Sequence, residues 1–352
     1  MSSGAWPPPG PSAGHLPVPP TTQLPAAAWR FPHAEPTPYH LMLRTWTYAW
    51  WRPVVGVLLA VVSFFVAASV VYLAVAAVAA LFGSGAYLDD FERQVGAISS
   101  GDVGPESLLA LNLGLASMIP ITWLLMRWLH RMRPRWLASV VPRFRWRFFA
   151  VCLGVAVVAL LAQVLVGLLL PAGSEDDLSG AVNDFTVRTA LTALVVLAST
   201  PLQAAGEEYL FRGYLLQAFG SLFRSRWVAV VGTALLFAIA HGSQNFPLFF
   251  DRFAFGLIAG WLVTRTGGLE AGIALHILNN FLAFGFALAF GDIGSALAIS
   301  EVSWWNILLT VTQSGVYTLL VVWVARRMSL QTATRPPSDG PAESPGPAVA
   351  AA

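Results

Sequence analysis

The chain has 352 residues, of which 56% are apolar and only 11% are charged. A soluble domain carries roughly 25% charged residues, so this composition and a net charge of +2 indicate a membrane protein. They exclude an ordinary nucleic-acid binder, a disulfide-stapled secreted domain and a soluble Rossmann enzyme. The single cysteine, Cys152, lies in an apolar run and is expected to be a small core residue.

Both ends of the chain are of low complexity. Residues 1–42 are rich in Pro, Ala, Gly and Ser and show no basic region followed by an apolar one, so they predict a disordered tail rather than a signal peptide. Residues 329–352 have a similar composition and predict a second tail.

Eight apolar segments lie between the tails, and a bilayer-spanning helix needs about 20 apolar residues. The sequence therefore predicts an all-α, polytopic membrane helix bundle with about eight transmembrane helices. The segments are approximately 53–82, 107–126, 148–170, 189–206, 227–241, 248–264, 269–290 and 303–325.

The charges between these segments alternate in sign along the chain. Arginines crowd the region between the second and third segments, and acids such as Glu175, Asp176 and Asp177 follow the third. With eight crossings every Arg-rich stretch falls on one side, which the positive-inside rule assigns to the cytoplasm. We therefore expect a multi-pass protein of the cell membrane with both termini cytoplasmic.

Ionisable residues inside apolar segments are costly, so each is a candidate for a functional site. Glu207 and Glu208 close the fourth segment, and Arg212 follows Glu208 at the helical spacing that favours an ion pair. Glu207 points about 100° away from that pair. We expect Glu208 and Arg212 to form a structural ion pair, which leaves Glu207 to face a cavity.

Two histidines lie in other segments, each with a helical neighbour. Phe237 and His241 share one face of the fifth segment, and His276 and Asn280 share one face of the seventh. A carboxylate can take a proton from water, imidazoles can orient that water or bind a metal, and an amide can donate to an oxyanion.

These residues resemble, in order, the three motifs of the CPBP family of intramembrane proteases, also called the CAAX protease and bacteriocin-processing, or Abi, family. The resemblance covers about residues 190–285, within a catalytic region at 187–328 that follows N-terminal transmembrane helices at 43–186. It implies a membrane protease in which Glu207 is the general base, helped by His241. His276 and Asn280 would stabilise the oxyanion, and Glu208, Arg212 and Phe237 would support the site.

The cofactor and the substrate are less defined. Glu207, His241 and His276 are a possible zinc set with an open position for water, but no His-Glu-x-x-His helix is present and a glutamate could activate water directly. We therefore expect no obligatory, tightly bound zinc. The expected partners are the lipid bilayer and a membrane-associated peptide or protein substrate, with no nucleic acid; substrate identity and oligomeric state stay open.

Two other functions compete with the protease. A transporter with a proton relay would string ionisable groups through several spans, whereas here they gather in the fourth, fifth and seventh segments. A non-catalytic membrane scaffold could keep the same residues for structure.

Overall fold

The computed structural model describes residues 32–82, 103–171 and 182–335 of the chain. These residues form helices and two isolated bridges, and each of the eight predicted segments corresponds to a helix or to a run of two. The predicted all-α membrane bundle is therefore confirmed. The helices are α2 (Trp51–Phe82), α5 and α6 (Pro105–Ala116 and Met118–Leu124), α8 (Trp146–Gly167), α9 (Val187–Glu208), α11 (Arg226–Ala240), α12 (Phe246–Thr266), α13 (Glu270–Phe290) and α15 (Asn306–Arg327).

Seven helical runs in the described residues are long and apolar enough to cross a membrane. The exception among the predicted segments is α11, which has 15 residues. At 1.5 Å per residue its length is about 22 Å, which is less than the ~30 Å of a hydrocarbon core. A helix of this length that starts at the membrane surface ends inside the bilayer, and His241 follows its last residue.

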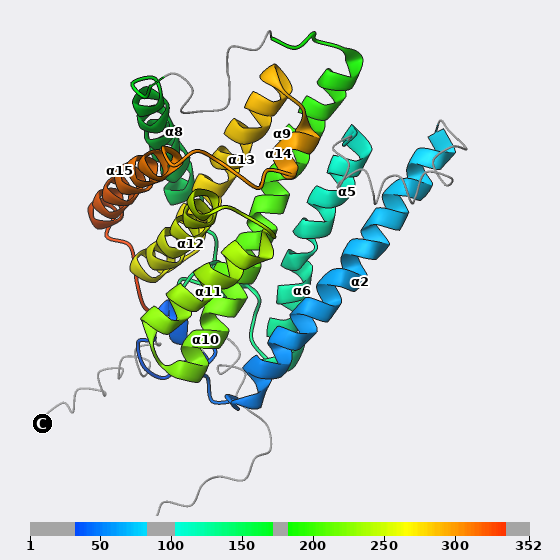
Figure 1. Cartoon of the computed structure of the whole chain (residues 1–352). Helices are drawn as coiled ribbons and strands as arrows, with labels where there is room; N and C mark the ends of the chain where they lie inside the picture. The colour runs from blue at the N-terminus through cyan, green and yellow to red at the C-terminus, as the bar shows by residue number, and fades with distance from the viewer. Residues whose placement is uncertain (1–31, 83–102, 172–181, 336–352) are drawn as a thin grey trace, which may run out of the picture.

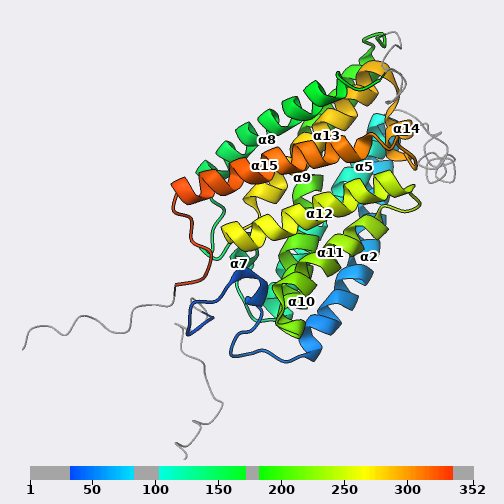
Figure 2. The same cartoon turned by 60° about the vertical axis from the view of Figure 1, so that its left-hand side comes forward.

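The two helices that carry most of the site lie side by side in the middle of the bundle. Figures 1 and 2 show α9 beside α13, with α8 and α15 on one side of this pair and α5 and α2 on the other. Helix α12 packs between α11 and α15. A short helix, α14 (Ile293–Leu297), connects α13 to α15.

Helix α9 continues without a break beyond its last residue. It passes into a π-helix, η3 (Tyr209–Leu215), and then into α10 (Leu216–Phe223), so that the helical run spans 37 residues. A π-helix is rare and is frequently found at functional sites. A second π-helix, η2 (Leu125–Leu129), ends the run that begins with α5.

Large apolar side chains are exposed along the outer helices. In α2, for example, Phe65 and Leu81 are 65% and 82% exposed. Lipid tails are as apolar as these side chains, so packing against other helices is not needed to shield them. The helices instead approach closely at small residues: a Cβ atom on Gly206 of α9 would overlap the backbone of Leu115 in α5.

Parts of both predicted tails are packed at one end of the bundle. Residues 32–42 include a 3-10 helix, η1 (Tyr39–Leu41), and the side chains of Tyr39 and Met42 are fully buried. A bridge joins Pro38 to Ala333, beyond α15. The prediction of disorder is therefore corrected for residues 32–42 and 329–335, because apolar side chains in these Pro-containing stretches have a surface to pack against; the rest of both tails lies outside the described residues.

The same end of the bundle holds an ion pair that the sequence analysis missed. Arg145, just before α8, binds both carboxylate oxygens of Glu270, the first residue of α13, with its Nη2 2.6 Å from Oε2. Its Nη1 also donates to the carbonyl of Thr266, at the end of α12. This arginine therefore ties three helices together.

Candidate active site

The predicted ion pair at the end of α9 is present. Arg212 Nη1 donates to Glu208 Oε1 over 2.8 Å, and both side chains are fully buried. Glu208 is the last residue of α9 and Arg212 lies in the π-helix that follows. A buried pair of this kind costs a large desolvation penalty, and removal of one partner leaves an uncompensated charge.

His276, on α13, lies between the two adjacent acids of α9. Its Nδ1 is 3.0 Å from Glu208 Oε1, and its Nε2 is 3.5 Å from Glu207 Oε2. Glu207 and His276 are 7% and 5% exposed. The imidazole thus connects the ion-paired acid to the acid that the sequence analysis proposes as the base, and Glu208 is more than a partner of Arg212.

Gln203 is a member of this cluster that the sequence analysis missed. Its Nε2 donates to Glu207 Oε1 over 2.9 Å, and its Oε1 accepts from Asn280 Nδ2 over 2.8 Å. The side chain is buried. The sequence contained one indication of this contact: Gln203 precedes Glu207 by four residues, a spacing that places the two side chains on the same face of a helix. Through Gln203, the amide of Asn280 is held on the same side of α9 as Glu207.

These contacts leave one oxygen of Glu207 available for chemistry. Oε1 accepts the hydrogen bond from Gln203, whereas Oε2 is buried and accepts no hydrogen bond from the described residues. A buried carboxylate oxygen without a donor is costly unless water or a ligand reaches it.

Aromatic rings from two further helices pack around the ionisable groups. The Arg212 guanidinium lies 4.1 Å from the ring centre of Phe237 on α11 and 5.0 Å from that of Phe255 on α12. Both rings also meet His276, at centroid separations of 6.0 and 5.0 Å. The predicted supporting role of Phe237 thus has a physical basis in cation–π contact, and Phe255 is a second ring that the sequence analysis did not identify.

His241 lies beside this cluster but makes a different contact. Its Nδ1 hydrogen-bonds the carbonyl oxygen of Phe237 over 2.7 Å, and the side chain is exposed. Its ring also packs against that of Phe237, with the two ring centres 4.5 Å apart. In this structure the imidazole that contacts Glu207 is that of His276, so a role for His241 beside the general base stays a prediction.

Close packing at a glycine holds α13 against the ion-paired acid. A Cβ atom on Gly272 would lie 2.6 Å from Glu208 Oε2. Gly272 lies one helical turn before His276, so the backbone of α13 comes close to the Glu208 side chain beside the site. This approach brings the His276 ring within reach of both acids.

The possible zinc set is only partly assembled. Glu207 Oε2 and His276 Nε2 are near each other, but among residues 32–82, 103–171 and 182–335 no three His, Cys, Asp or Glu side chains come together as a metal site. A catalytic zinc needs three protein ligands and an open position. The arrangement of these side chains does not provide the third ligand.

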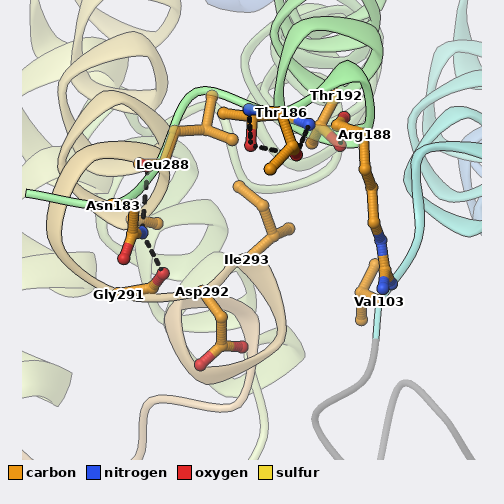
Figure 3. A pocket seen from close by; sticks show the side chains of 11 residues that line it. Val103, Asn183, Thr186, Arg188, Thr192, Leu288, Gly291, Asp292 and Ile293 are labelled. Carbon is orange, nitrogen blue, oxygen red and sulfur yellow. Dashed lines mark hydrogen bonds between the residues drawn. The ribbon is translucent and has the colours of Figure 1, made fainter.

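Two cavities in the described part of the chain lie away from this cluster. Figure 3 shows one of about 200 Å³ near the start of α9, where Asn183 donates to the carbonyls of Leu288 and Gly291. Another, of about 400 Å³, lies between the ends of α12 and α15. Neither is lined by the residues around Glu207, so the predicted cavity in front of Glu207 stays a prediction.

Comparison with known proteins places these residues in a family. Residues 189–282 match the family described as type II CAAX prenyl endopeptidase Rce1-like. An Escherichia coli protein called "Uncharacterized 24.3 kDa protein" is 31% identical over 148 residues, which cover 41% of this chain and 67% of that protein. "Uncharacterized protein YyaK" of Bacillus subtilis (strain 168) is 22% identical over 220 residues, 59% of this chain and 72% of that protein. No solved structure matches.

The fold and the matched region together define a multi-pass membrane protein of the protease class, and Glu207, His241 and His276 all fall within the matched residues. The chain belongs to the CPBP family, whose Rce1-like members are CAAX-type endopeptidases.

Proposed function

We propose that this protein is an intramembrane endopeptidase that hydrolyses a peptide bond of a membrane-associated protein or peptide, with Glu207 as the base that activates water. The observation that carries the proposal is the state of Glu207: one carboxylate oxygen is fixed by Gln203, and the other is buried and free of hydrogen bonds to the described residues. That free oxygen faces His276 Nε2 at 3.5 Å.

The proposed reaction has two steps. Glu207 Oε2 takes a proton from water while the water oxygen attacks the carbonyl carbon of the scissile bond, so that the carbonyl oxygen becomes an oxyanion. An amide –NH₂ has two donors, and Asn280 uses one of them for Gln203. The other can donate to the oxyanion. The imidazole of His276 already donates from Nδ1–H to Glu208, so its Nε2 can donate to the oxyanion when the ring carries a second proton. The intermediate then collapses, the C–N bond breaks, and the proton passes from Glu207 to the departing amine.

The chemistry depends on exclusion of bulk water and on fixed side chains. His276 is held by Glu208, which is itself held by Arg212. Preoriented donors contribute more in a site with few competing waters than on a surface. Zinc is not a step in this mechanism, because the side chains do not form a three-ligand set.

Substitution of the proposed base tests this function. We expect Glu207→Gln and His276→Ala to fold and to abolish cleavage, so that an uncleaved precursor accumulates in membranes that contain either variant and is revealed by proteomic comparison with the wild type. Glu270→Gln is the matched control, because Glu270 is also a buried, ion-paired acid but binds Arg145 instead. If the Glu207→Gln protein cleaves the same precursor at the wild-type rate, Glu207 is not the base.

A further inference from the structure

A second polar site lies at the end of the bundle, away from Glu207. The cavity of about 400 Å³ is bounded by the last turns of α12 and α15, the start of α11 and the chain after α15. Figure 2 shows the chain beyond α15 passing the end of α12. Three exposed arginines from three helices are among the residues that line this cavity, Arg226, Arg265 and Arg326, and its lining contains no acidic residue.

These three arginines have no carboxylate partner among the residues that the structure describes. Within the described ranges none of them forms an ion pair, whereas the nearby Arg145 is fully engaged by Glu270. Ser329 and Thr332, which carry hydroxyl groups, also line the cavity. The site therefore combines unneutralised positive charge with hydroxyl groups, which can donate hydrogen bonds to an anion.

The ends of the helices do not account for these charges. Arginines often occupy the last turn of a helix because they interact with its free carbonyls. In α12 the carbonyls of Val263, Thr266 and Gly267 already accept from other groups in the fold, including Arg145. In α15 the carbonyls of Val324 and Ala325 accept from the backbone of residues 328 and 330. Arg265 and Arg326 are thus free to bind something else.

Aromatic residues indicate the depth of the cavity in the membrane. The Arg226 and Arg265 guanidiniums lie 5.0 and 5.5 Å from the rings of Trp227 and Trp261. Tryptophan is enriched at the level of the lipid headgroups. Basic pockets between transmembrane helices at that level bind anionic headgroups, and arginine suits phosphate because its planar fork donates two parallel hydrogen bonds.

We propose that Arg226, Arg265 and Arg326 form a binding site for a phosphate group, which the headgroup of an anionic phospholipid supplies. The site is independent of the proposed peptidase. The bound headgroup would bridge α11, α12 and α15, and α11 and α12 carry Phe237 and Phe255 of the cluster around Glu207.

The test measures lipid binding by the full chain purified in detergent. In native mass spectrometry we expect the wild type to retain dioleoylphosphatidylglycerol in preference to dioleoylphosphatidylcholine, and each Arg→Gln substitution at 226, 265 or 326 to weaken the preferred binding about fivefold. Arg327→Gln is the matched control, since Arg327 is exposed like the three cavity arginines and adjoins Arg326, but lies over Trp323 and does not line the cavity. Arg265→Lys with Arg326→Lys, which keeps the charge and loses the fork, is expected to weaken binding by less than the glutamine pair.

A second arm separates the two sources of phosphate. If sodium phosphate alone displaces the lipid, the site is a phosphate site that free phosphate can also fill; if it does not, the lipid headgroup is the ligand. Equal retention of the two lipids by the wild type would overturn the proposal. So would a loss in Arg327→Gln as large as that in the cavity variants, because binding would then follow surface charge alone.

Discussion

Gln203 donates a hydrogen bond to Glu207 from one turn earlier on the same helix, and the distance between Nε2 and Oε1 is 2.9 Å. The same carboxamide accepts a hydrogen bond from Asn280 on α13. A single side chain thus sets the orientation of both the proposed base and the proposed oxyanion donor. It also determines which oxygen of Glu207 remains open.

Replacement of Gln203 should impair turnover more than substrate binding. We expect Gln203→Ala to lower kcat by about tenfold to a hundredfold, because small losses of alignment at a reacting centre cost this much, with KM changed far less. Gln217→Ala is the control, since Gln217 is also buried but its amide binds the carbonyl of Trp136. Steady-state kinetics on a membrane-presented peptide separates the two parameters. An equal loss of kcat in both variants would show a general effect on the fold.

The ion pair between Glu208 and Arg212 should matter for both stability and activity. Removal of one partner of a buried pair costs about 3–5 kcal/mol, so Glu208→Gln and Arg212→Gln should each lower the free energy of unfolding by about that amount. Glu208→Gln should in addition reduce cleavage, since Glu208 also holds His276.

A double-variant cycle tests whether the loss of stability comes from the direct interaction of Glu208 with Arg212. The protein with both Glu208→Gln and Arg212→Gln contains no unpaired charge at this place, so it should be more stable than the Arg212→Gln variant. Denaturant unfolding measures stability, and the cleavage assay measures activity. Additive losses in the double variant would contradict a direct interaction of the two side chains.

The close approach of α13 to α9 can be tested at two glycines of one helix. Gly272→Ala should reduce stability by about 1–3 kcal/mol, because the added Cβ would lie 2.6 Å from Glu208 Oε2. Gly285→Ala is the matched control, since no atom lies within 4 Å of its added Cβ. It should be neutral or stabilising by about 0.5–1 kcal/mol, because alanine favours the helix. Thermal unfolding of the two variants side by side measures the difference.

The stability of the protein should depend on pH through His130, the residue that directly follows η2. Burial, together with the nearby charge of Arg52, lowers the pKa of His130 to about 4 from its usual 6.5. A lowered pKa means that the folded state favours the neutral imidazole. The stabilisation is therefore complete above pH 6.5 and is lost as the pH falls towards 4, by at most about 3 kcal/mol.

His130→Gln should flatten part of this pH dependence, because glutamine does not titrate. Glutamine can still hydrogen-bond the Tyr214 hydroxyl that His130 contacts at 2.9 Å, so the local structure should be kept. Melting temperatures measured between pH 7.5 and 4.5 report the slope. Arg135→Gln, an exposed substitution nearby, should leave the slope as in the wild type. His33 also has a lowered pKa, caused mainly by burial, so some dependence on pH will remain.

Removal of metal should leave cleavage intact. Glu207 and His276 provide two donors, and the described residues do not add a third. We expect less than stoichiometric zinc in the purified protein by elemental analysis, and unchanged activity after chelation. Stoichiometric zinc, with activity lost on its removal and regained on its return, would contradict this expectation.

Much of the fold could be predicted from the sequence because helix formation in lipid depends on residues that are close together in the sequence. Long apolar runs must be helical in lipid, where each backbone group needs an internal partner. The pairing of Glu208 with Arg212 also follows from spacing within one helix. The packed residues 32–42 could not be found in this way, because burial of Tyr39 depends on a surface built by distant segments.

The site was predictable only in part, for the same reason. Glu207, Glu208 and His276 were recognised by type and order, but the contact of His276 with both acids joins α13 to α9 and depends on how these helices pack. Phe255 and the pair of Arg145 with Glu270 lack a local pattern. For Gln203 a pattern existed, at four residues before Glu207, but a lone glutamine in an apolar helix is usually a packing residue.

The bridge between Pro38 and Ala333 brings together two backbone segments that are far apart in the sequence, where Thr37 also hydrogen-bonds Thr334, 297 residues away. A short linker between these two segments would close the chain into a ring without moving any helix. A circular permutant opened in the stretch between α8 and α9 would then keep every helix in its native orientation.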